Sequence, residues 1–292
     1  MLGSESVAWR GRTRHLAVIA AATTIAAAAF PAASSAKLIE AISVSADVHV
    51  NAGQTGRQLL KCPARAVALN VGVPSGLTSI DSVPRPTARG WDLSFAAGSN
   101  AIDTRAVLRC VRMDLPQGVD GVTLAVETQI EPVDDLPPGL SEQRVLRCST
   151  GFTPTGWGLD RTVDGNGLSI AAATPSKKAW RFAIKNTGAA NASGVLYGRC
   201  LEKKQFAETG QRHSFATRVA NSKASGGSAT RSCRSSEFSV ATGFTLPITD
   251  DIFITGTGPF GRRDGEWHFA KASGAGPVKT SLVCLSTTTS FH

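Results

Sequence analysis

The sequence predicts an all-β protein of three tandem, disulfide-stapled, antiparallel β-sandwich-like units. Three observations predict this class. A pattern of cysteine, glycine, proline, tryptophan and cysteine occurs three times along the chain. Short apolar runs are separated by turn residues about every 8–12 positions, which is typical of sandwiches and barrels. Helical periodicity is absent after residue 36. The same observations also allow one body with threefold pseudo-symmetry.

The cysteine spacing identifies the repeat. The two cysteines of each copy are 48, 52 and 51 residues apart, and the opening cysteines of successive copies are 86 and 85 residues apart. A steady period with one cysteine pair per period indicates repeated structural units. Of the pairings open to six cysteines, the repeat therefore selects Cys62–Cys110, Cys148–Cys200 and Cys233–Cys284.

The first 36 residues have the pattern of a secretory signal peptide. Arginines at positions 10, 12 and 14 precede an apolar, alanine-rich run from Leu16 to Phe30, and small residues follow at Ser34–Ala36. An uncleaved N-terminal anchor is the alternative. Because an even number of cysteines in an exported chain indicates disulfides, we expect a secreted or cell-envelope protein. The expected units are 1–36 (signal), 37–121, 122–208 and 209–292.

In the first unit, residues Ala41–Val50 alternate between apolar and polar positions and predict a half-buried strand. Leu59–Cys62 opens the core, and Ala66–Val73 predicts a second buried strand. Further strands are expected at Leu77–Val83, Trp91–Phe95 and Val107–Met113.

The second and third units repeat this plan. In the second unit, we expect a polar, proline-containing loop at Glu131–Glu142 and a hairpin turn at Asp164–Gly167. Its strands are predicted at Val122–Val126, Val145–Cys148, Trp180–Ile184 and Val195–Leu201. Those of the third unit are predicted at Phe215–Val219, Phe238–Phe244, Ile252–Thr255, Trp267–Ala270 and Ser281–Leu285.

Within each copy, a glycine follows the first cysteine and a proline precedes the tryptophan. The glycines are Gly72, Gly156 and Gly243. On these residues, the unit resembles a module of bacterial exported proteins of unassigned function. The resemblance covers nearly all of residues 41–286. It implies an exported β module and transfers no catalytic residue.

The tryptophans divide into two groups. Trp91, Trp180 and Trp267 recur, so we expect them in the core beside the disulfides, with a sugar-stacking platform as the alternative. Trp157 has no counterpart in the other copies and is the candidate for an exposed binding contact.

A basic residue precedes four of the cysteines: Lys61, Arg109, Arg147 and Arg199. Because neighbours on a strand point to opposite faces, these side chains are expected to face outward when the cysteine faces the core. They are therefore candidate binding residues for an anionic polymer, while solubility and edge protection are the simpler explanation.

Motifs for catalysis or metal binding are absent from the sequence. It has no His-Glu-x-x-His, no Gly-x-Ser-x-Gly and no Cys-x-x-Cys. Oxygen-bearing side chains at Asp160, Asp164 and Asn166 suggest calcium, but the glycines between them favour a hairpin turn. We expect no cofactor, no metal and no catalytic residue.

The expected function is non-catalytic binding or structural display at the cell envelope or outside the cell. Lys and Arg outnumber Asp and Glu by 31 to 22, for which a soluble surface with a basic bias is the simpler explanation. The candidate partner is a cell-wall glycan or an anionic polymer. Nucleic acid is not expected, because a basic–aromatic stripe is missing. The alternatives are a secreted hydrolase with its site between units and a secreted inhibitor that uses Glu131–Glu142. The sequence leaves the ligand and the oligomeric state open.

Overall fold

The structure is a computed structural model that describes residues 39–72, 79–113, 124–161, 167–206, 211–247, 252–271 and 276–291. The predicted signal peptide lies outside these residues, as do Asp164 and Asn166 of the predicted hairpin turn. No helix long and apolar enough to cross a membrane is found in the described part of the chain.

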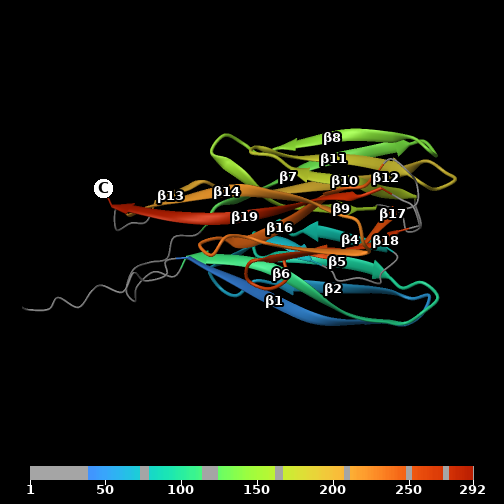
Figure 1. Cartoon of the computed structure of the whole chain (residues 1–292), viewed down its shortest axis with the longest axis horizontal. Helices are drawn as coiled ribbons and strands as arrows, with labels where there is room; N and C mark the ends of the chain where they lie inside the picture. Colours follow the sequence, from blue (N-terminus) through green and yellow to red (C-terminus); the bar gives the residue numbers. More distant parts are fainter. Residues whose placement is uncertain are drawn as a thin grey trace, which may run out of the picture. The chain divides into compact units, whose positions relative to one another are not determined.

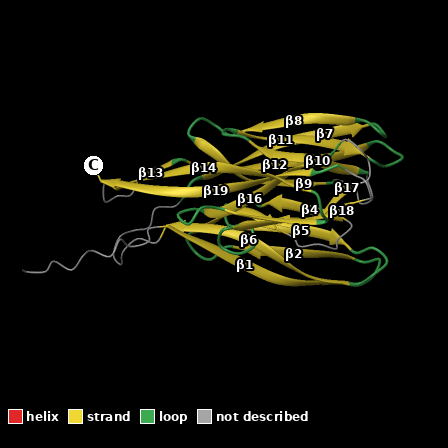
Figure 2. Ribbon diagram, viewed as in Figure 1, coloured by secondary structure: helices red, strands yellow, loops and turns green. Residues whose placement is uncertain are grey.

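The described residues form only strands, turns and links, which confirms the all-β prediction (Figure 2). The first third of the chain contains β1 (Ile39–Val50), β2 (Thr55–Lys61), β3 (Ala66–Gly72), β4 (Ser79–Pro84), β5 (Gly90–Ala96) and β6 (Ile102–Met113). The second contains β7 (Val126–Leu136), β8 (Ser141–Arg147), β9 (Phe152–Asp160), β10 (Leu168–Pro175), β11 (Ala179–Asn186) and β12 (Ala192–Glu202). The last contains β13 (Lys204–Phe206), β14 (Gln211–Ala224), β15 (Ser228–Ser232), β16 (Phe238–Thr245), β17 (Ile252–Gly258), β18 (Asp264–Lys271) and β19 (Val278–Phe291).

The three thirds share one connectivity. We call β1–β6 repeat 1, β7–β12 repeat 2 and β14–β19 repeat 3, while the short β13 pairs with β14. In every repeat, the first, sixth and third strands form one antiparallel sheet, and the second, fifth and fourth form another. The cysteine period therefore coincides with a period in strand order.

The sheets continue from one repeat into the next. Strand β4 pairs with β9, and β10 pairs with β16, so that two sheets contain strands from neighbouring repeats (Figure 1). At the third boundary, β17 contacts β3, although these two strands share no ladder. Residues Lys37–His292 form one compact unit. This continuity favours the alternative of one pseudo-symmetric body over three separate sandwiches.

The third strands of the repeats, β3, β9 and β16, contact one another at the centre of the unit. Each of them carries a β-bulge opposite the closing cysteine of its sixth strand. A glycine follows three residues after each bulge, at Gly72, Gly158 and Gly243. The sequence analysis assigned Gly156 to this position, and the structure shows that Gly158 is the equivalent residue.

These glycines allow close contact between repeats. A Cβ on Gly158 would lie 2.0 Å from the carbonyl oxygen of Ser82 in repeat 1, and one on Gly243 would lie 2.4 Å from that of Ala173 in repeat 2. A Cβ on Gly72 would lie 2.5 Å from the Cα of Gly258 in repeat 3. The repeated glycine is therefore required where neighbouring backbones meet.

The three disulfides are present with the predicted pairing, Cys62–Cys110, Cys148–Cys200 and Cys233–Cys284. Each joins the residue that follows the second strand to the sixth strand, and so ties together the two sheets of one repeat. Trp91, Trp180 and Trp267 are fully buried, which confirms their predicted place in the core.

Candidate anion-binding surface

Arg109 and Arg199 do not face solvent. Each side chain is only 1% exposed, so the predicted outward orientation is wrong for these two residues. The strand alternation itself is correct, because their side chains do point away from the disulfides. The outer face of their sheet is covered by another repeat, repeat 3 for Arg109 and repeat 1 for Arg199, and they are therefore buried between repeats.

Arg109 on β6 joins repeat 1 to repeat 3. Its Nη1 donates to Ser43 Oγ of its own repeat at 2.7 Å. Its Nη2 donates to Ser239 Oγ at 3.2 Å, to the Pro259 carbonyl at 3.2 Å and to the Gly261 carbonyl. Arg109 thus connects the two repeats at the boundary where the strands share no ladder.

Arg199 on β12 makes the equivalent connection from repeat 2 to repeat 1. Its Nη1 donates to Thr128 Oγ1 at 2.8 Å and its Nη2 to the Arg85 carbonyl at 3.2 Å. The guanidinium carbon lies 5.6 Å from the ring centroid of Trp91, a cation–π distance. In repeat 3, the corresponding position before the cysteine is the buried Val283.

Burial lowers the pKa of Arg109 to about 10, and the pKa of Arg199 is also lowered to about 10 by the same desolvation. Both groups therefore stay charged at neutral pH. Because their charges are held between repeats, neither can contact an external polymer without opening the structure. Their role is structural.

Trp157 is not the exposed contact that the sequence suggested. Its ring packs against Phe244 of repeat 3 at 5.9 Å between centroids and against Trp180 at 6.4 Å. Its Nε1 donates to the Thr242 carbonyl at 2.7 Å. Trp157 therefore belongs to the contact between repeats 2 and 3.

Lys61 and Arg147 are exposed, as predicted. They end β2 and β8, beside the link that joins the fourth and fifth strands of the same repeat. In every repeat, the backbone N–H of the opening cysteine donates a hydrogen bond to the backbone carbonyl of the last basic residue of that link. The pairs are Cys62 with Arg89 (2.8 Å), Cys148 with Lys178 (2.9 Å) and Cys233 with Arg263 (2.9 Å). A basic residue thus occupies an equivalent position beside each disulfide.

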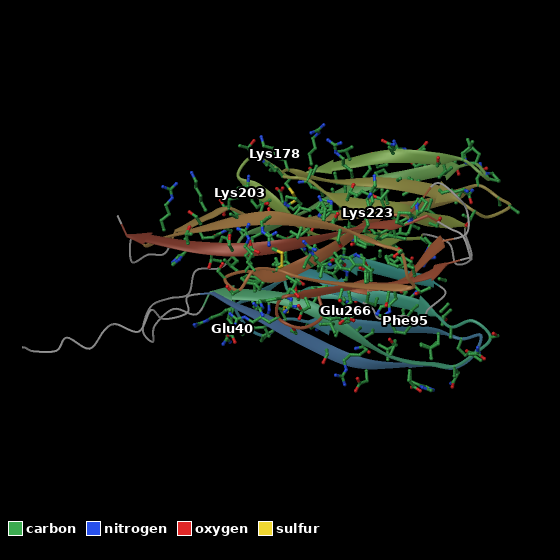
Figure 3. The ribbon with its side chains drawn as sticks, viewed as in Figure 1. Glu40, Phe95, Lys178, Lys203, Lys223 and Glu266 are labelled. Carbon is green, nitrogen blue, oxygen red and sulfur yellow. A yellow bond between two sulfur atoms is a disulfide. The ribbon has the colours of Figure 1, made fainter. Side chains whose placement is uncertain are left out.

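These links form a surface that we call the basic end. Its members are the exposed basic residues in the two links beside each disulfide or at the end of the second strand, except Arg85, which is paired with Asp92. Within the described residues, none of them forms an ion pair. They are Lys61, Arg65 and Arg89 in repeat 1, Arg147, Lys177 and Lys178 in repeat 2, and Arg234, Arg262 and Arg263 in repeat 3; Lys178 is labelled in Figure 3.

Two links of the basic end lie against a neighbouring repeat. The bond from Arg199 to Arg85 places the repeat 1 link beside the disulfide strand of repeat 2. The bonds from Arg109 to Pro259 and Gly261 place the repeat 3 link beside the disulfide strand of repeat 1. Each buried arginine therefore holds a basic link of one repeat beside the disulfide strand of another repeat.

The carboxylates near the basic end already have partners. Glu237 accepts hydrogen bonds from Arg218 Nε at 2.8 Å and from the Arg234 N–H at 2.9 Å, and the Arg218 bonds hold the pKa of Glu237 below its usual value. Asp92 lies 2.9 Å from Arg85 Nε. Apart from an electrostatic interaction of Glu237 with Arg234, these pairings involve none of the nine basic side chains.

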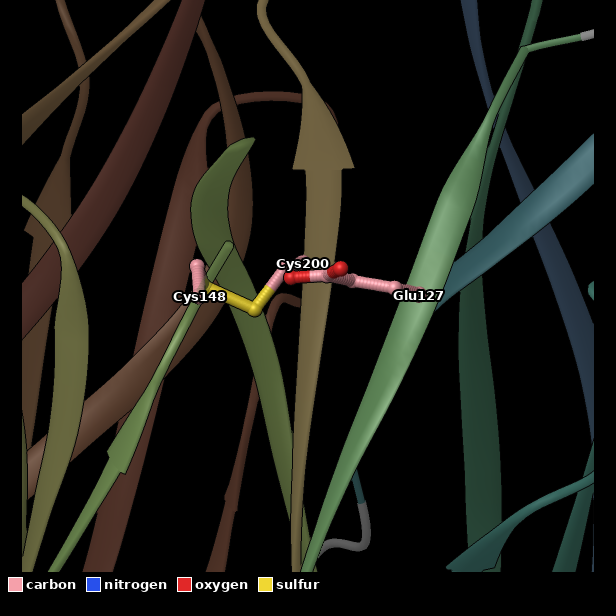
Figure 4. A group of neighbouring side chains, drawn as sticks. All are labelled: Glu127, Cys148 and Cys200. Carbon is pink, nitrogen blue, oxygen red and sulfur yellow. A yellow bond between two sulfur atoms is a disulfide. The ribbon is translucent and has the colours of Figure 1, made fainter. Parts of the chain in front are cut away.

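Two carboxylates lie beside disulfides without forming a metal site. Glu127 lies next to Cys148 and Cys200 (Figure 4), and Glu237 lies next to Cys233 and Cys284. Metal binding by cysteine requires a thiolate, which a disulfide sulfur is not. The Glu127 carboxylate instead accepts the backbone N–H of Ser149 at 2.6 Å.

The histidine that most resembles a catalytic base is His49. Its Nδ1 lies 2.6 Å from Asp103 Oδ1, but its Nε2 lies 3.1 Å from Asn51 Oδ1. A Ser-His-Asp triad needs a nucleophilic hydroxyl at that second nitrogen. The His49 pair therefore gives no support to the hydrolase alternative.

The predicted Glu131–Glu142 loop is largely strand. Strand β7 continues to Leu136 and β8 begins at Ser141, so only four residues link them. Proline in this segment favoured a loop in the sequence analysis. Strand β7 can contain Pro132 because it is an edge strand, where proline is tolerated. The extended loop on which the inhibitor alternative depended is absent from this part of the structure.

No protein-family model matches the chain, and no curated protein sequence is significantly similar to it. The sequence reasoning missed seven of the nine basic-end residues. A usable signal was present, since each copy places at least one basic residue shortly before the recurring tryptophan: Arg89, Lys178 and Arg263.

Proposed function

We propose that the protein is an exported, non-catalytic binding protein that attaches to an anionic polymer of the cell surface through its basic end. The observation that carries this proposal is the set of exposed basic side chains repeated beside each disulfide, none of which forms an ion pair within the described residues. Three disulfides are consistent with an oxidising, extracellular environment. The signal-like first 36 residues and the resemblance to an exported bacterial module support the same location.

The proposal depends on many weak contacts. One exposed ion pair contributes about 0–1 kcal/mol and is screened by salt. A polymer with repeated negative charges can engage several of the nine side chains at once, so that their contributions add through multivalency. This mode requires neither a deep pocket nor a catalytic group.

The tryptophans do not provide a glycan platform. The three recurring rings are fully buried, and Trp157 packs between repeats 2 and 3. Stacking on a sugar requires an exposed aromatic face. An anionic polymer is therefore better supported than a neutral glycan.

The test is retention of the oxidised protein on an immobilised phosphate-bearing or uronate polymer at low and high salt. The variant Lys178→Ala/Arg263→Ala removes one basic-end charge from each of two repeats. If each contact contributes about 0.5 kcal/mol, we expect binding at low salt to weaken about fivefold.

The matched control is Arg57→Ala/Lys223→Ala, which also removes one lysine and one arginine from exposed strand positions outside the basic end. The control should retain nearly full binding. An equal loss of binding in both variants would show that binding depends on net charge and not on the basic end. Absence of binding at low salt would refute the proposal.

A further inference from the structure

Tyr197 on β12 lies just outside the part of its sheet that repeat 1 covers. It is two residues from the buried Arg199, so its side chain points to the same face of the strand, and it is half-buried. It is the one tyrosine of the chain. Its direct partner on the edge strand β7 is Ile130, which at 61% is the most exposed large hydrophobic side chain of the described residues. Partners across antiparallel strands have Cβ atoms about 4.5–5.5 Å apart, so these two side chains are neighbours.

The next pair on this face is also apolar. Val195 on β12 is paired with Pro132 on β7, and each lies two residues from a member of the first pair. Pro132 is exposed and Val195 is half-buried. Because the strand register places all four side chains on one face, they form a continuous surface. We call it the repeat 2 patch: Ile130, Pro132, Val195 and Tyr197.

The other repeats provide an internal comparison. Each of their pairs at the same positions, counted from the closing cysteine, contains at least one polar or charged side chain. These pairs are Ser45–Val107 and Asp47–Arg105 in repeat 1, and Asn221–Ser281 and Lys223–Lys279 in repeat 3. The apolar patch is therefore specific to repeat 2, and a packing requirement shared by the three repeats does not explain it.

Two polar groups border the patch. Asp160 on β9 is paired with Val195 from the other side, so its side chain points to the same face. Burial and the charge of Asp160 raise the pKa of Tyr197, in agreement with a carboxylate near the phenol. Within the described residues, neither group forms a hydrogen bond or an ion pair, whereas the nearby Asp81 and Arg161 are paired at 2.6 Å. The phenol and the Asp160 carboxylate are therefore available to a ligand.

The backbone of repeat 1 bounds the patch on one side. Opposite Tyr197 on β9 is Gly158, and a Cβ there would lie 2.0 Å from the carbonyl oxygen of Ser82 on β4. That Cβ would point to the face of Tyr197, so β4 crosses this face next to the tyrosine. The patch is thus bounded by repeat 1 and ends at the β7 edge of the sheet on the opposite side.

The size and chemistry of the patch favour a sugar over a protein partner. A specific protein interface uses about 20–30 residues on each side, far more than these four side chains. A pyranose ring has a face of C–H groups, which pack against aromatic and aliphatic side chains, and hydroxyl groups at its rim, which donate to a carboxylate. Because the charge at the edge of the patch is negative, an anionic ligand is disfavoured.

We propose that the repeat 2 patch and Asp160 bind a neutral pyranose unit of a glycan. The sugar ring packs against Tyr197 and Ile130, and a sugar hydroxyl donates to Asp160. The inference is independent of the polymer binding proposed for the basic end, which depends on other residues.

The single tyrosine gives the test one signal. The protein is made with isotope-labelled tyrosine, observed by NMR and titrated to about 10 mM with two neutral oligosaccharides, cellotetraose and tetra-N-acetylchitotetraose. We expect at least one of them to shift the Tyr197 signal with a Kd of about 1 mM, equally at low and high salt, because the contact contains no ion pair. Tetragalacturonate, the anionic comparison, should leave the signal unchanged.

Two substitutions keep the labelled tyrosine. Ile130→Ser and Asp160→Ala should each weaken binding about fivefold or more, because they remove an apolar contact and a hydrogen-bond acceptor. The matched control is Val145→Ser, which changes an exposed apolar residue on β8 and should leave binding unchanged. In calorimetry, Tyr197→Phe, which keeps the ring, should bind more tightly than Tyr197→Ala. Circular dichroism checks that the variants are folded.

Three results would overturn the inference: no shift with either neutral oligosaccharide, an equal loss in Ile130→Ser and Val145→Ser, or an equal response to tetragalacturonate. The variant Lys178→Ala/Arg263→Ala, which is expected to weaken polymer retention, should leave the titration unchanged. A failure of sugar binding is therefore distinguishable from a failure of polymer binding.

Discussion

Arg109 and Arg199 are buried side chains that stabilise contacts between repeats and also hold links that carry part of the basic end. Arg109 donates to carbonyl groups in a link of repeat 3, and Arg199 donates to one in a link of repeat 1. Those links carry part of the basic end. The sequence identified both arginines as notable and assigned them the wrong environment, because alternation along a strand says which face a residue takes but not what covers that face.

Arg199→Ala tests this structural role. The change leaves the Arg85 carbonyl without its donor and removes a packed contact with Trp91. We expect a loss of about 2–4 kcal/mol in the free energy of unfolding, measured in urea.

Arg199→Met should cost less than Arg199→Ala, because it keeps most of the volume and repeat 3 places an apolar Val283 at the equivalent position. The exposed control Arg147→Ala should change stability by less than about 0.5 kcal/mol. Equal effects of Arg199→Ala and Arg147→Ala would contradict the structural role.

Glu237 gives a prediction in pH. Its hydrogen bonds with Arg218 lower its pKa in the folded protein below the ordinary value of a glutamate. Between the pKa of Glu237 in the unfolded chain and its lower pKa in the folded protein, the unfolded chain therefore binds more protons. The free energy of unfolding decreases as the pH falls through this window. Above the unfolded pKa, the contribution of Glu237 is fully present.

We expect Glu237→Gln to flatten the pH dependence of the free energy of unfolding between about pH 5 and the lower folded pKa. The measurement is urea unfolding at a series of pH values. An unchanged slope in the variant would show that Glu237 does not contribute to acid sensitivity.

At the scale of the element, the sequence predicted most strands and could not predict their neighbours. Alternation between Ala41 and Val50 located β1, and the recurring tryptophans located β5, β11 and β18. The contact of β9 with β4 and β16 depends on packing between residues far apart in sequence. For this reason, Trp157 and Gly158 on β9 were misinterpreted.

Gly158→Ala tests the contact between β9 and β4. The added Cβ would lie 2.0 Å from the Ser82 carbonyl oxygen, and the backbones would have to separate. We expect a loss of about 2–4 kcal/mol in the free energy of unfolding.

Gly226→Ala is the matched control, since nothing lies within 4 Å of its added Cβ and its φ lies outside the left-handed region. Its effect should be below about 0.5 kcal/mol. Comparable effects of the two substitutions would argue against the close approach at Gly158.

At the scale of the whole molecule, the continuity of sheets between repeats has a measurable consequence. Because β4 pairs with β9 and β10 pairs with β16, unfolding one repeat would remove the neighbour of another. We expect one cooperative unfolding transition for the oxidised protein, with intrinsic fluorescence and far-ultraviolet circular dichroism giving the same midpoint. Separate transitions would indicate independent units.

The cysteine period revealed the repeat but could not reveal the basic end as a whole. Lys61 and Arg147 were found because they precede cysteines. The remaining members lie in links whose proximity follows from Arg109 and Arg199 crossing between repeats. A surface assembled by long-range contacts has no local pattern along the chain.

The pairing of the cysteines also has a consequence for the order in which the disulfides form. Each bridge joins cysteines that are consecutive in the sequence, 62 with 110, 148 with 200 and 233 with 284. A chain threaded through a membrane from its N-terminus would present these thiols to an oxidant in that same order. Pairing each newly arrived thiol with the one before it would generate the native set, and no disulfide isomerase would be required to correct it.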